Sequence, residues 1–130
     1  IINKTKMITI DEIHFFCLKK ELTSEEFPFD NSTLVFKVLG KVFAVCPLAA
    51  WESGNPSITL KCDPEYAQEL RNTYDSIRPG HHSNKRHWNT VYLSAPGFPL
   101  KFIFELIDHS YSMVVEKMSK KLKTQFKNHN

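Results

Sequence analysis

The sequence predicts an α+β fold, in which helices flank the apolar face of a single antiparallel sheet of about four or more strands. Three observations support this prediction. Apolar residues recur at helical spacing in three segments of the chain. In four other segments apolar and polar residues alternate, which is typical of an antiparallel sheet with one buried and one wet face. The segments follow one another in the order α-β-β-β-α-β-α, which fits helices packed on one sheet.

Length and composition indicate a single domain over residues 1–130, with flexible ends expected at 1–8 and 123–130. Hydrophobic residues make up 42% of the chain and charged residues 24%, which excludes an intrinsically disordered protein. No apolar run approaches the roughly 20 residues that cross a bilayer, so we expect no membrane partner. The net charge of +3 permits an anionic partner without requiring one. The oligomeric state cannot be derived from the sequence, and we favour a monomer.

The first helix is expected over about residues 10–20. Thr9 and Glu12 have the spacing of a capping box, in which each side chain accepts a hydrogen bond from the backbone N–H of the other residue. The stretch 21–32 that follows is polar and contains Pro28. We therefore expect it to be a loop.

Two strands are predicted next, over 34–38 and 42–46, where apolar residues dominate one face. Gly40 and Lys41 lie between them. Glycine tolerates the positive φ at the first position of a type II′ turn, so this pair predicts a tight hairpin.

A longer connection over 47–56 leads to a third strand over 58–62, whose residues alternate between apolar and polar. The period then changes. Asp63 can cap a helix and Pro64 suits the first helical position, so a helix is expected from there to about Ser76.

A fourth strand is expected over 90–94, and the longest helical pattern runs from Pro99 to Leu122. Its length is compatible with one long helix or with two nearly collinear helices. In the second case, the break is expected near His109 and Ser110.

The three cysteines form no Cys-x-x-Cys pair, and an odd, sparse set is unusual for a small secreted domain. We therefore expect a reducing, cytoplasmic location. Cys17, Cys46 and Cys62 each lie in an apolar stretch and are interpreted as small buried hydrophobic residues rather than nucleophiles.

One segment, residues 78–89, differs from the rest of the chain in composition. It holds three of the six histidines, one tryptophan, three positive charges and no acidic residue. A long loop that is rich in polar donors is a frequent place for a functional site. Three kinds of site compete for this segment.

A metal site has the least support. His81, His82 and His87 supply three imidazoles, but the segment contains no carboxylate or cysteine. Neighbouring histidines point apart in an extended chain, and the nearby positive charges repel a divalent cation. We therefore predict no metal and no other cofactor.

An enzyme is the next alternative. A catalytic histidine needs an orienting carboxylate and a nucleophile within reach, and Asp75, Asp108 and Ser110 are candidates by residue type alone. The chain contains no nucleotide-binding loop motif, serine-hydrolase motif or zinc-protease motif. We assign no catalytic residue.

DNA binding is the favoured hypothesis. The positive side chains of the segment can neutralise phosphates, its asparagines can hydrogen-bond to base edges, and Trp88 or His82 can stack or wedge between bases. Lys37 and Lys61 are expected on the wet face of the sheet, where they would join the loop in one basic patch. The predicted nucleic-acid contacts are Lys37, Lys61, Arg78, His82, Asn84, Lys85, Arg86, His87 and Trp88.

The alternative from another class is a small-ligand or protein-interaction module without catalysis, whose pocket is lined by the same loop. A concave, partly apolar cleft beside His82 and Trp88 would favour this alternative, whereas a flat or convex basic face would favour nucleic acid. A structural role is also open. In that case Trp88 anchors the core, while His82 and Asn84 hold the loop in shape through backbone hydrogen bonds.

An ordered series of short segments matches one known family of proteins. The segments are Cys17-Leu18, Glu25-Glu26-Phe27-Pro28-Phe29, Phe36-Lys37-Val38, Gly40-Lys41-Val42-Phe43-Ala44, Leu60-Lys61-Cys62-Asp63-Pro64-Glu65, Leu70-Arg71, Pro79-Gly80, His82, Asn84-Lys85-Arg86-His87-Trp88-Asn89-Thr90-Val91, Leu106-Ile107-Asp108-His109-Ser110-Tyr111 and Val114-Val115. On these segments the chain resembles the MmcQ/YjbR-like family, small bacterial domains of unknown function, over nearly everything from Thr9 to Leu122.

The resemblance implies an antiparallel sheet flanked by helices, of a type called double-wing, and a proposed DNA-binding role. It implies no catalytic residue, because none is established in the family. Two positions depart from the family pattern, which usually has an aromatic residue at His81 and methionine at Ser83. A contact surface built on this loop would therefore be more polar here.

Overall fold

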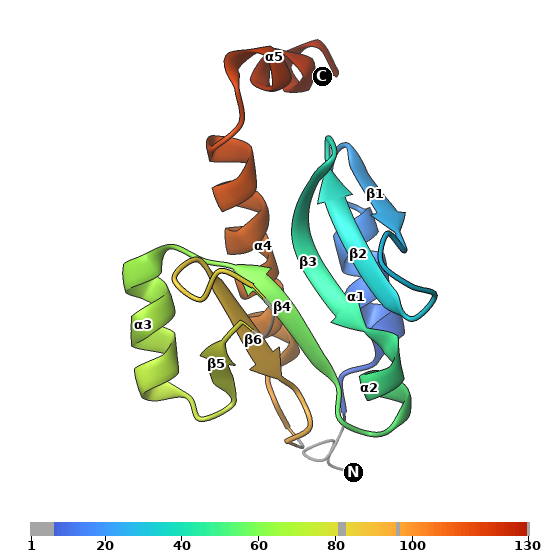
Figure 1. Ribbon diagram of the computed structural model, residues 1–130, viewed down its shortest axis with the longest axis vertical. Helices are drawn as coiled ribbons and strands as arrows, with labels where there is room; N and C mark the ends of the chain where they lie inside the picture. Colours follow the sequence, from blue (N-terminus) through green and yellow to red (C-terminus); the bar gives the residue numbers. More distant parts are fainter. Residues whose placement is uncertain (1–6, 81–82, 96, 130) are drawn as a thin grey trace.

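Within the residues that it describes, 7–80, 83–95 and 97–129, the computed structural model contains one six-stranded antiparallel sheet flanked by helices (Figure 1). The helices are α1 (Ile10–Leu18), α2 (Leu48–Glu52), α3 (Pro64–Thr73), α4 (Leu100–Glu116) and α5 (Lys120–His129). The strands are β1 (Thr23–Glu26), β2 (Thr33–Val38), β3 (Lys41–Pro47), β4 (Ser57–Lys61), β5 (Ile77–Pro79) and β6 (Trp88–Tyr92). The strand order is β1-β2-β3-β4-β6-β5, with every neighbouring pair antiparallel, which confirms the predicted fold class.

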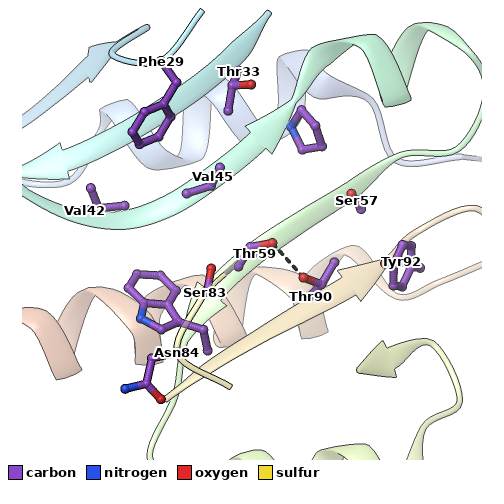
Figure 2. A pocket seen from close by; sticks show the side chains of 12 residues that line it. Phe29, Thr33, Val42, Val45, Ser57, Thr59, Ser83, Asn84, Thr90 and Tyr92 are labelled. Carbon is purple, nitrogen blue, oxygen red and sulfur yellow. Dashed lines mark hydrogen bonds between the residues drawn. The ribbon is translucent and has the colours of Figure 1, made fainter. Parts of the chain in front are cut away.

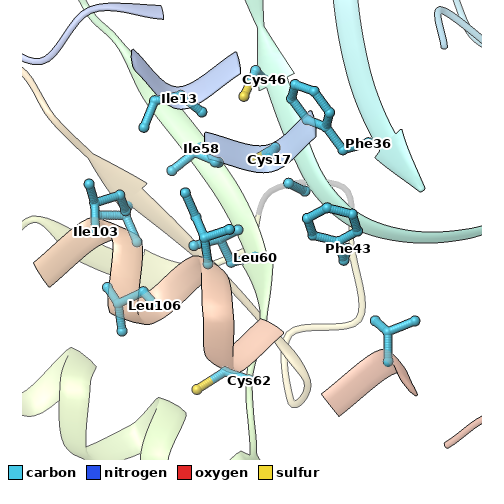
Figure 3. Close-up of a cluster of buried hydrophobic side chains, with 14 of the residues drawn as sticks. Ile13, Cys17, Phe36, Phe43, Cys46, Ile58, Leu60, Cys62, Ile103 and Leu106 are labelled. Atoms are coloured by element: carbon cyan, nitrogen blue, oxygen red, sulfur yellow. The ribbon is translucent and has the colours of Figure 1, made fainter. Parts of the chain in front are cut away.

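The hydrophobic core lies between one face of the sheet and the helices α1 and α4 (Figure 3). Phe36 of β2, Ile58 of β4 and Ile103 of α4 are fully buried in it. All three cysteines are buried and unpaired, as the apolar stretches around them predict. Among the helices of the described part of the chain, none is long and apolar enough to cross a membrane.

Local sequence determines where two of the helices begin. Thr9 caps α1, because its hydroxyl accepts the backbone N–H of Glu12 at 3.2 Å while the Glu12 carboxylate accepts the backbone N–H of Thr9 at 2.9 Å. This is the predicted capping box. Asp63 caps α3 by accepting the N–H of Tyr66 at 3.1 Å, and Pro64 occupies the first helical position.

The two edge strands of the sheet were not predicted from periodicity. β1 lies within the polar stretch 21–32, for which the sequence predicts a loop, and β5 follows α3. An edge strand pairs on one side only, and most of β1 is exposed, so its residues carry no alternating pattern. Pro79 is tolerated in β5 because an edge position does not need its missing N–H.

Two boundaries on the sheet differ from prediction. β6 begins at Trp88 and ends at Tyr92, so Trp88 belongs to the sheet rather than to the preceding loop. The β2–β3 turn is centred on Leu39 and Gly40, which both have positive φ, 47° and 80°. This is type I′ geometry rather than type II′, because β3 begins at Lys41, which pairs with Val38, and the turn therefore lies one residue earlier than predicted.

The long C-terminal helical pattern forms two helices, and the break between them follows Glu116 instead of lying near His109. α4 is continuous, and Met118 is buried in the turn that follows it. The hydroxyl of Ser119 accepts the N–H of Leu122 at 3.2 Å and so caps the start of α5.

Parts of the two expected flexible ends lie within the described residues. Ile8 is buried, and residues 123–129 belong to α5. Residues 1–6 and 130 lie outside the described residues.

The sheet opens between β3 and β4 (Figure 1). In the described residues, two pairs join these strands, Ala44 with Leu60 and Val45 with Thr59. Beyond them the strands diverge. We call β1, β2 and β3 the first wing, and β4, β6 and β5 the second wing.

Ser110 of α4 bridges the two wings. Its hydroxyl donates to the carbonyl of Phe43 at 2.6 Å and accepts the N–H of Lys61 at 2.8 Å. Phe43 and Lys61 would form the next pair of the β3–β4 ladder after Ala44 and Leu60. The Ser110 hydroxyl therefore takes the place of a direct hydrogen bond between the two strands. Ser110 is fully buried, and α4 therefore replaces a strand–strand contact at the point of divergence.

We expect Ser110→Ala to lower the free energy of unfolding by about 1–3 kcal/mol, because it leaves a buried carbonyl and a buried N–H without their partner. Urea unfolding followed by circular dichroism measures this change. Ser112→Ala is the matched control, since Ser112 is exposed on the same helix and should change stability by less than about 0.5 kcal/mol. Equal stability of the two variants would contradict the bridging role of Ser110.

Candidate functional site

A cavity of about 550 Å³ lies on the sheet face opposite α1 and α4, where the two wings diverge (Figure 2). Successive strand residues point to opposite faces, so Val45 and Thr59 face the cavity while Ala44 and Leu60 face the core. The first wing contributes Phe29, Thr33, Val42, Val45 and Pro47, and the second wing with its β5–β6 connection contributes Ser57, Thr59, Ser83, Asn84, Trp88, Thr90 and Tyr92.

Among the described residues, the lining of the cavity is uncharged. Half of the lining residues are aliphatic or aromatic, and the others carry hydroxyl groups or an amide. Thr59 and Thr90 face each other across the β4–β6 pair, with their hydroxyl oxygens 2.8 Å apart (Figure 2). The lining therefore combines apolar walls with a few hydroxyl groups, which is typical of sites for small organic molecules.

Trp88 is half-buried in the cavity wall and is held from behind by the backbone. The N–H of Gly80 donates to the carbonyl of Trp88 at 2.8 Å. A Cβ atom on Gly80 would lie 2.9 Å from the Cβ atom of Trp88, so only glycine permits this close approach.

Arg71 of α3 fixes the same region from the helix side. Its Nε donates to the side-chain oxygen of Asn89 at 2.6 Å and its Nη2 to the carbonyl of Trp88 at 3.2 Å. The same Nη2 donates to the carbonyl of Lys85. One guanidinium group therefore ties the loop before β6 to the start of that strand.

Phe29 stands at the mouth of the cavity, and 74% of its surface is exposed. Its loop is held by the Asp30 carboxylate, which accepts the backbone N–H groups of Ser32 at 2.8 Å and Thr33 at 2.7 Å. The hydrogen bond from Ser32 is the main cause that lowers the pKa of Asp30. An exposed aromatic ring is thus held at the entrance by a fixed turn.

The strand cations proposed as nucleic-acid contacts border the cavity. Paired residues of neighbouring strands share a face. Lys37 pairs with Val42, Lys61 with Trp88 and Arg78 with Thr90. Each of these three partners lines the cavity, and the Lys37 ammonium group is paired with the Glu26 carboxylate at 3.0 Å.

The loop residues are arranged differently. The side-chain oxygen of Asn84 accepts the N–H of Arg86 at 3.0 Å, and its carbonyl accepts the N–H of His87, so Asn84 shapes the loop. The ammonium group of Lys85 turns back to the carbonyl of Gly80 at 3.2 Å. Arg86 is exposed and His87 is half-buried. His82 lies outside the described residues.

The described residues among the predicted site residues fall into two groups. The strand cations lie around the cavity, while the loop cations lie at its end beside β6. Sequence reasoning did not anticipate the apolar part of the lining or the role of Arg71. One signal was present for the lining: residues 42–46 contain no polar residue, which is typical of a strand that is apolar on both faces.

The titratable groups with shifted pKa values near the core lie away from the cavity. Burial raises the pKa of Cys17 and Cys62 to about 12, so both thiols remain protonated and unreactive. Among the described residues, no group of three histidine, cysteine, aspartate or glutamate side chains could hold a metal ion. Among the described residues, the lining of the cavity includes no histidine, cysteine, aspartate or glutamate.

His109 of α4 serves a structural contact on the helix side. Its Nε2 accepts the N–H of Asp63, the cap of α3, at 3.1 Å, and its ring packs edge-on against Tyr66. Burial lowers the pKa of His109, because the imidazolium form would be poorly solvated there. The neutral ring is the form that can accept this hydrogen bond.

Comparison with known proteins gives a consistent set of relatives. The YjbR family model matches residues 18–113. Uncharacterized protein YjbR of Escherichia coli (strain K12) is 33% identical over 108 residues, covering 83% of this chain and 88% of the relative. Uncharacterized protein YbdF of Escherichia coli O157:H7 is 38% identical over 96 residues, covering 72% and 74%.

Among solved structures, protein DR2400 of Deinococcus radiodurans, which contains a DUF419 domain, has a TM-score of 0.80. The two chains are 37% identical, and the match covers 94% of this chain and 90% of that one. The residues matched by the family model include every residue that lines the cavity.

We expect the free energy of unfolding to fall as the pH is lowered from 7 toward 5. The pKa of His109 is lower in the folded chain than in the unfolded chain, so the unfolded chain binds the proton first. The contribution of His109 is complete above the ordinary histidine pKa of about 6.5 and is lost as the pH falls through the lower folded value.

His109→Gln isolates this effect, because the glutamine oxygen can accept the Asp63 N–H but does not titrate in this range. Urea unfolding of both proteins at several pH values between 5 and 7.5 gives the comparison. The variant should show a flatter dependence on pH than the unmodified chain. Parallel curves would show that His109 does not carry this part of the dependence.

Proposed function

This chain belongs to the YjbR family, and from that premise we propose that it is a small-ligand-binding domain whose site is the cavity between the two wings. The curated relatives described above are named as uncharacterized, so the proposal is argued from the chain's own geometry. The observation that carries it is the shape and lining of the cavity. A concave, partly apolar cleft beside Trp88 is the feature by which a ligand site differs from a flat basic face.

The size of the cavity supports this proposal. Ligand sites commonly enclose about 300–1,000 Å³ and combine apolar walls with a few polar groups. The cavity of about 550 Å³ falls in this range, with Trp88 on its wall and Phe29 at its mouth. An exposed aromatic ring held at the entrance can close over a bound molecule and so remove apolar surface from water.

The residue types favour binding over catalysis. The lining contains no histidine, cysteine, carboxylate, lysine or arginine among its described residues. General acid–base and nucleophilic catalysis depend on such groups within hydrogen-bond reach of the substrate. The hydroxyl groups of Thr59 and Thr90 already engage each other, which is consistent with an orienting role.

DNA binding is the second candidate, and a specific observation favours it. Lys61, Arg78 and Arg86 form no ion pair with any other described residue, so their charges are available to phosphates. The shape is less favourable, because the cations surround a hollow uncharged surface and Lys37 is already paired with Glu26.

We expect the neutral probe 4-phenylbutanol to bind in the cavity with a dissociation constant of about millimolar order, as its small size dictates. Titration followed by amide and indole NMR shifts should perturb Thr59, Thr90 and the indole of Trp88. Trp88→Ala should weaken binding by roughly 5–150-fold, since a stacked aromatic contact contributes about 1–3 kcal/mol.

Phe15→Ala is the matched control, because this aromatic ring is exposed on α1, on the far side of the sheet. It should leave binding unchanged. Val45→Phe fills the cavity without deleting a contact and should abolish binding. Absence of binding to the unmodified chain, or unchanged binding to both cavity variants, would refute the small-ligand proposal.

The DNA-binding candidate makes a separate prediction. If about four phosphates are contacted, affinity for duplex DNA should fall roughly a hundredfold between 50 and 200 mM salt, because counterions are released on binding. Replacing Lys85 and Arg86 by alanine should weaken binding to all sequences alike. Fluorescence anisotropy with a labelled duplex measures both effects. No binding at low salt, or binding insensitive to salt, eliminates this candidate and leaves the small-ligand proposal untouched.

A further inference from the structure

Arg78 lies on the strand next to the cavity wall. It lies on the edge strand β5 and pairs with Thr90, which lines the cavity. Directly paired residues of antiparallel strands have Cβ atoms about 5 Å apart on the same face of the sheet. The side chain of Arg78 is therefore on the sheet face that carries the cavity, at the edge of that face.

A second depression adjoins the cavity at this edge. It has a volume of about 390 Å³ and is lined mainly by polar residues, among them Asn55, Asp75, Ser76, Arg78 and Ser94. Tyr92 lines both this depression and the cavity, so the two share a wall. A molecule whose apolar body fills the cavity can thus extend its polar end past Tyr92 into the depression.

The charge of Arg78 is not engaged elsewhere. Its side chain is exposed and forms no hydrogen bond or ion pair with another described residue. Asp75 lines the same depression as Arg78, but the two side chains form no ion pair. Lys37, by contrast, is paired with Glu26 at 3.0 Å, and Lys20 is paired with Asp108.

An arginine in this setting is suited to one class of polar group. The planar guanidinium donates two parallel hydrogen bonds to a carboxylate, with a geometry that lysine does not offer. Asp75 in the same depression repels a second negative charge, which favours a monoanion over a more highly charged group. Among the described residues the cavity lining is uncharged, so a charged end of the ligand would find its counterion outside the cavity, at Arg78.

We infer that the ligand is an amphipathic monocarboxylate, whose apolar body occupies the cavity beside Trp88 and whose carboxylate is bound by Arg78 in the adjoining depression. This inference rests on the small-ligand function proposed above and adds the chemical class of the ligand. It separates two tasks: the cavity supplies affinity for the body, and Arg78 supplies selectivity for the charged end.

The test uses two probes with the same body, 4-phenylbutyrate and 4-phenylbutanol, titrated into the full chain by NMR at low salt. The unmodified chain should bind the carboxylate about tenfold more tightly than the alcohol. Arg78→Gln should reduce the affinity for the carboxylate to that for the alcohol and leave the alcohol unchanged. Because Arg78 is exposed on an edge strand, this variant is expected to fold, and its amide spectrum confirms that.

Two variants serve as controls for a general charge effect. Arg86→Gln removes an exposed arginine of the loop, and Lys61→Gln removes the cation beside Trp88. Both should keep the preference for the carboxylate. Loss of the preference in either control, to the same extent as in Arg78→Gln, overturns the assignment to Arg78.

The outcomes separate this inference from the function on which it rests. If neither probe binds, the small-ligand proposal fails together with the inference. If the alcohol binds and Trp88→Ala weakens its binding, the cavity function stands. In that case, equal affinities for the carboxylate and the alcohol, or unchanged carboxylate affinity in Arg78→Gln, overturn the carboxylate inference.

Discussion

The hydroxyl of Ser110, placed between the carbonyl of Phe43 and the N–H of Lys61, is the contact on which the arrangement of the two wings depends. A continuous sheet would have closed this gap with direct ladder bonds. Because a helix side chain takes that place, β3 and β4 separate while both remain attached to α4. The backbone groups at the gap are satisfied, and the opposite face of the sheet becomes concave.

The cavity follows from this divergence. Its two sides come from different wings, Val42 and Val45 from β3 and Thr59 and Trp88 from β4 and β6, so neither wing alone encloses it. A sheet face toward water is usually polar, whereas here it carries aliphatic and aromatic residues around an uncharged hollow. Lys37 and Arg78 pair with lining residues of neighbouring strands, and Lys61 follows Thr59 along β4, so these cations border the lining. This arrangement of a partly apolar lining and a charged border is the basis of the small-ligand proposal.

Residues outside the lining hold the cavity walls in place. Arg71 of α3 donates a hydrogen bond to the carbonyl of Trp88. Because Gly80 has no side chain, its backbone can lie close to Trp88. Asp30 fixes the turn that carries Phe29 to the mouth. These contacts are made by the chain's own residues, and walls that are held in this way would reduce the entropy cost of binding a ligand.

Local signals in the chain were enough to predict the cap of α1 at Thr9, the cap of α3 at Asp63, and the core strands whose residues alternate or are uniformly apolar. Each depends on residues a few positions apart, because helices and strands have short periods. The tertiary structure alone decided that polar segments become edge strands, that Trp88 lines a cavity, and that Arg78 lies beside Thr90. Those relations join residues many positions apart through strand register and the insertion of Ser110, and no local period records which strands become neighbours or where a sheet opens.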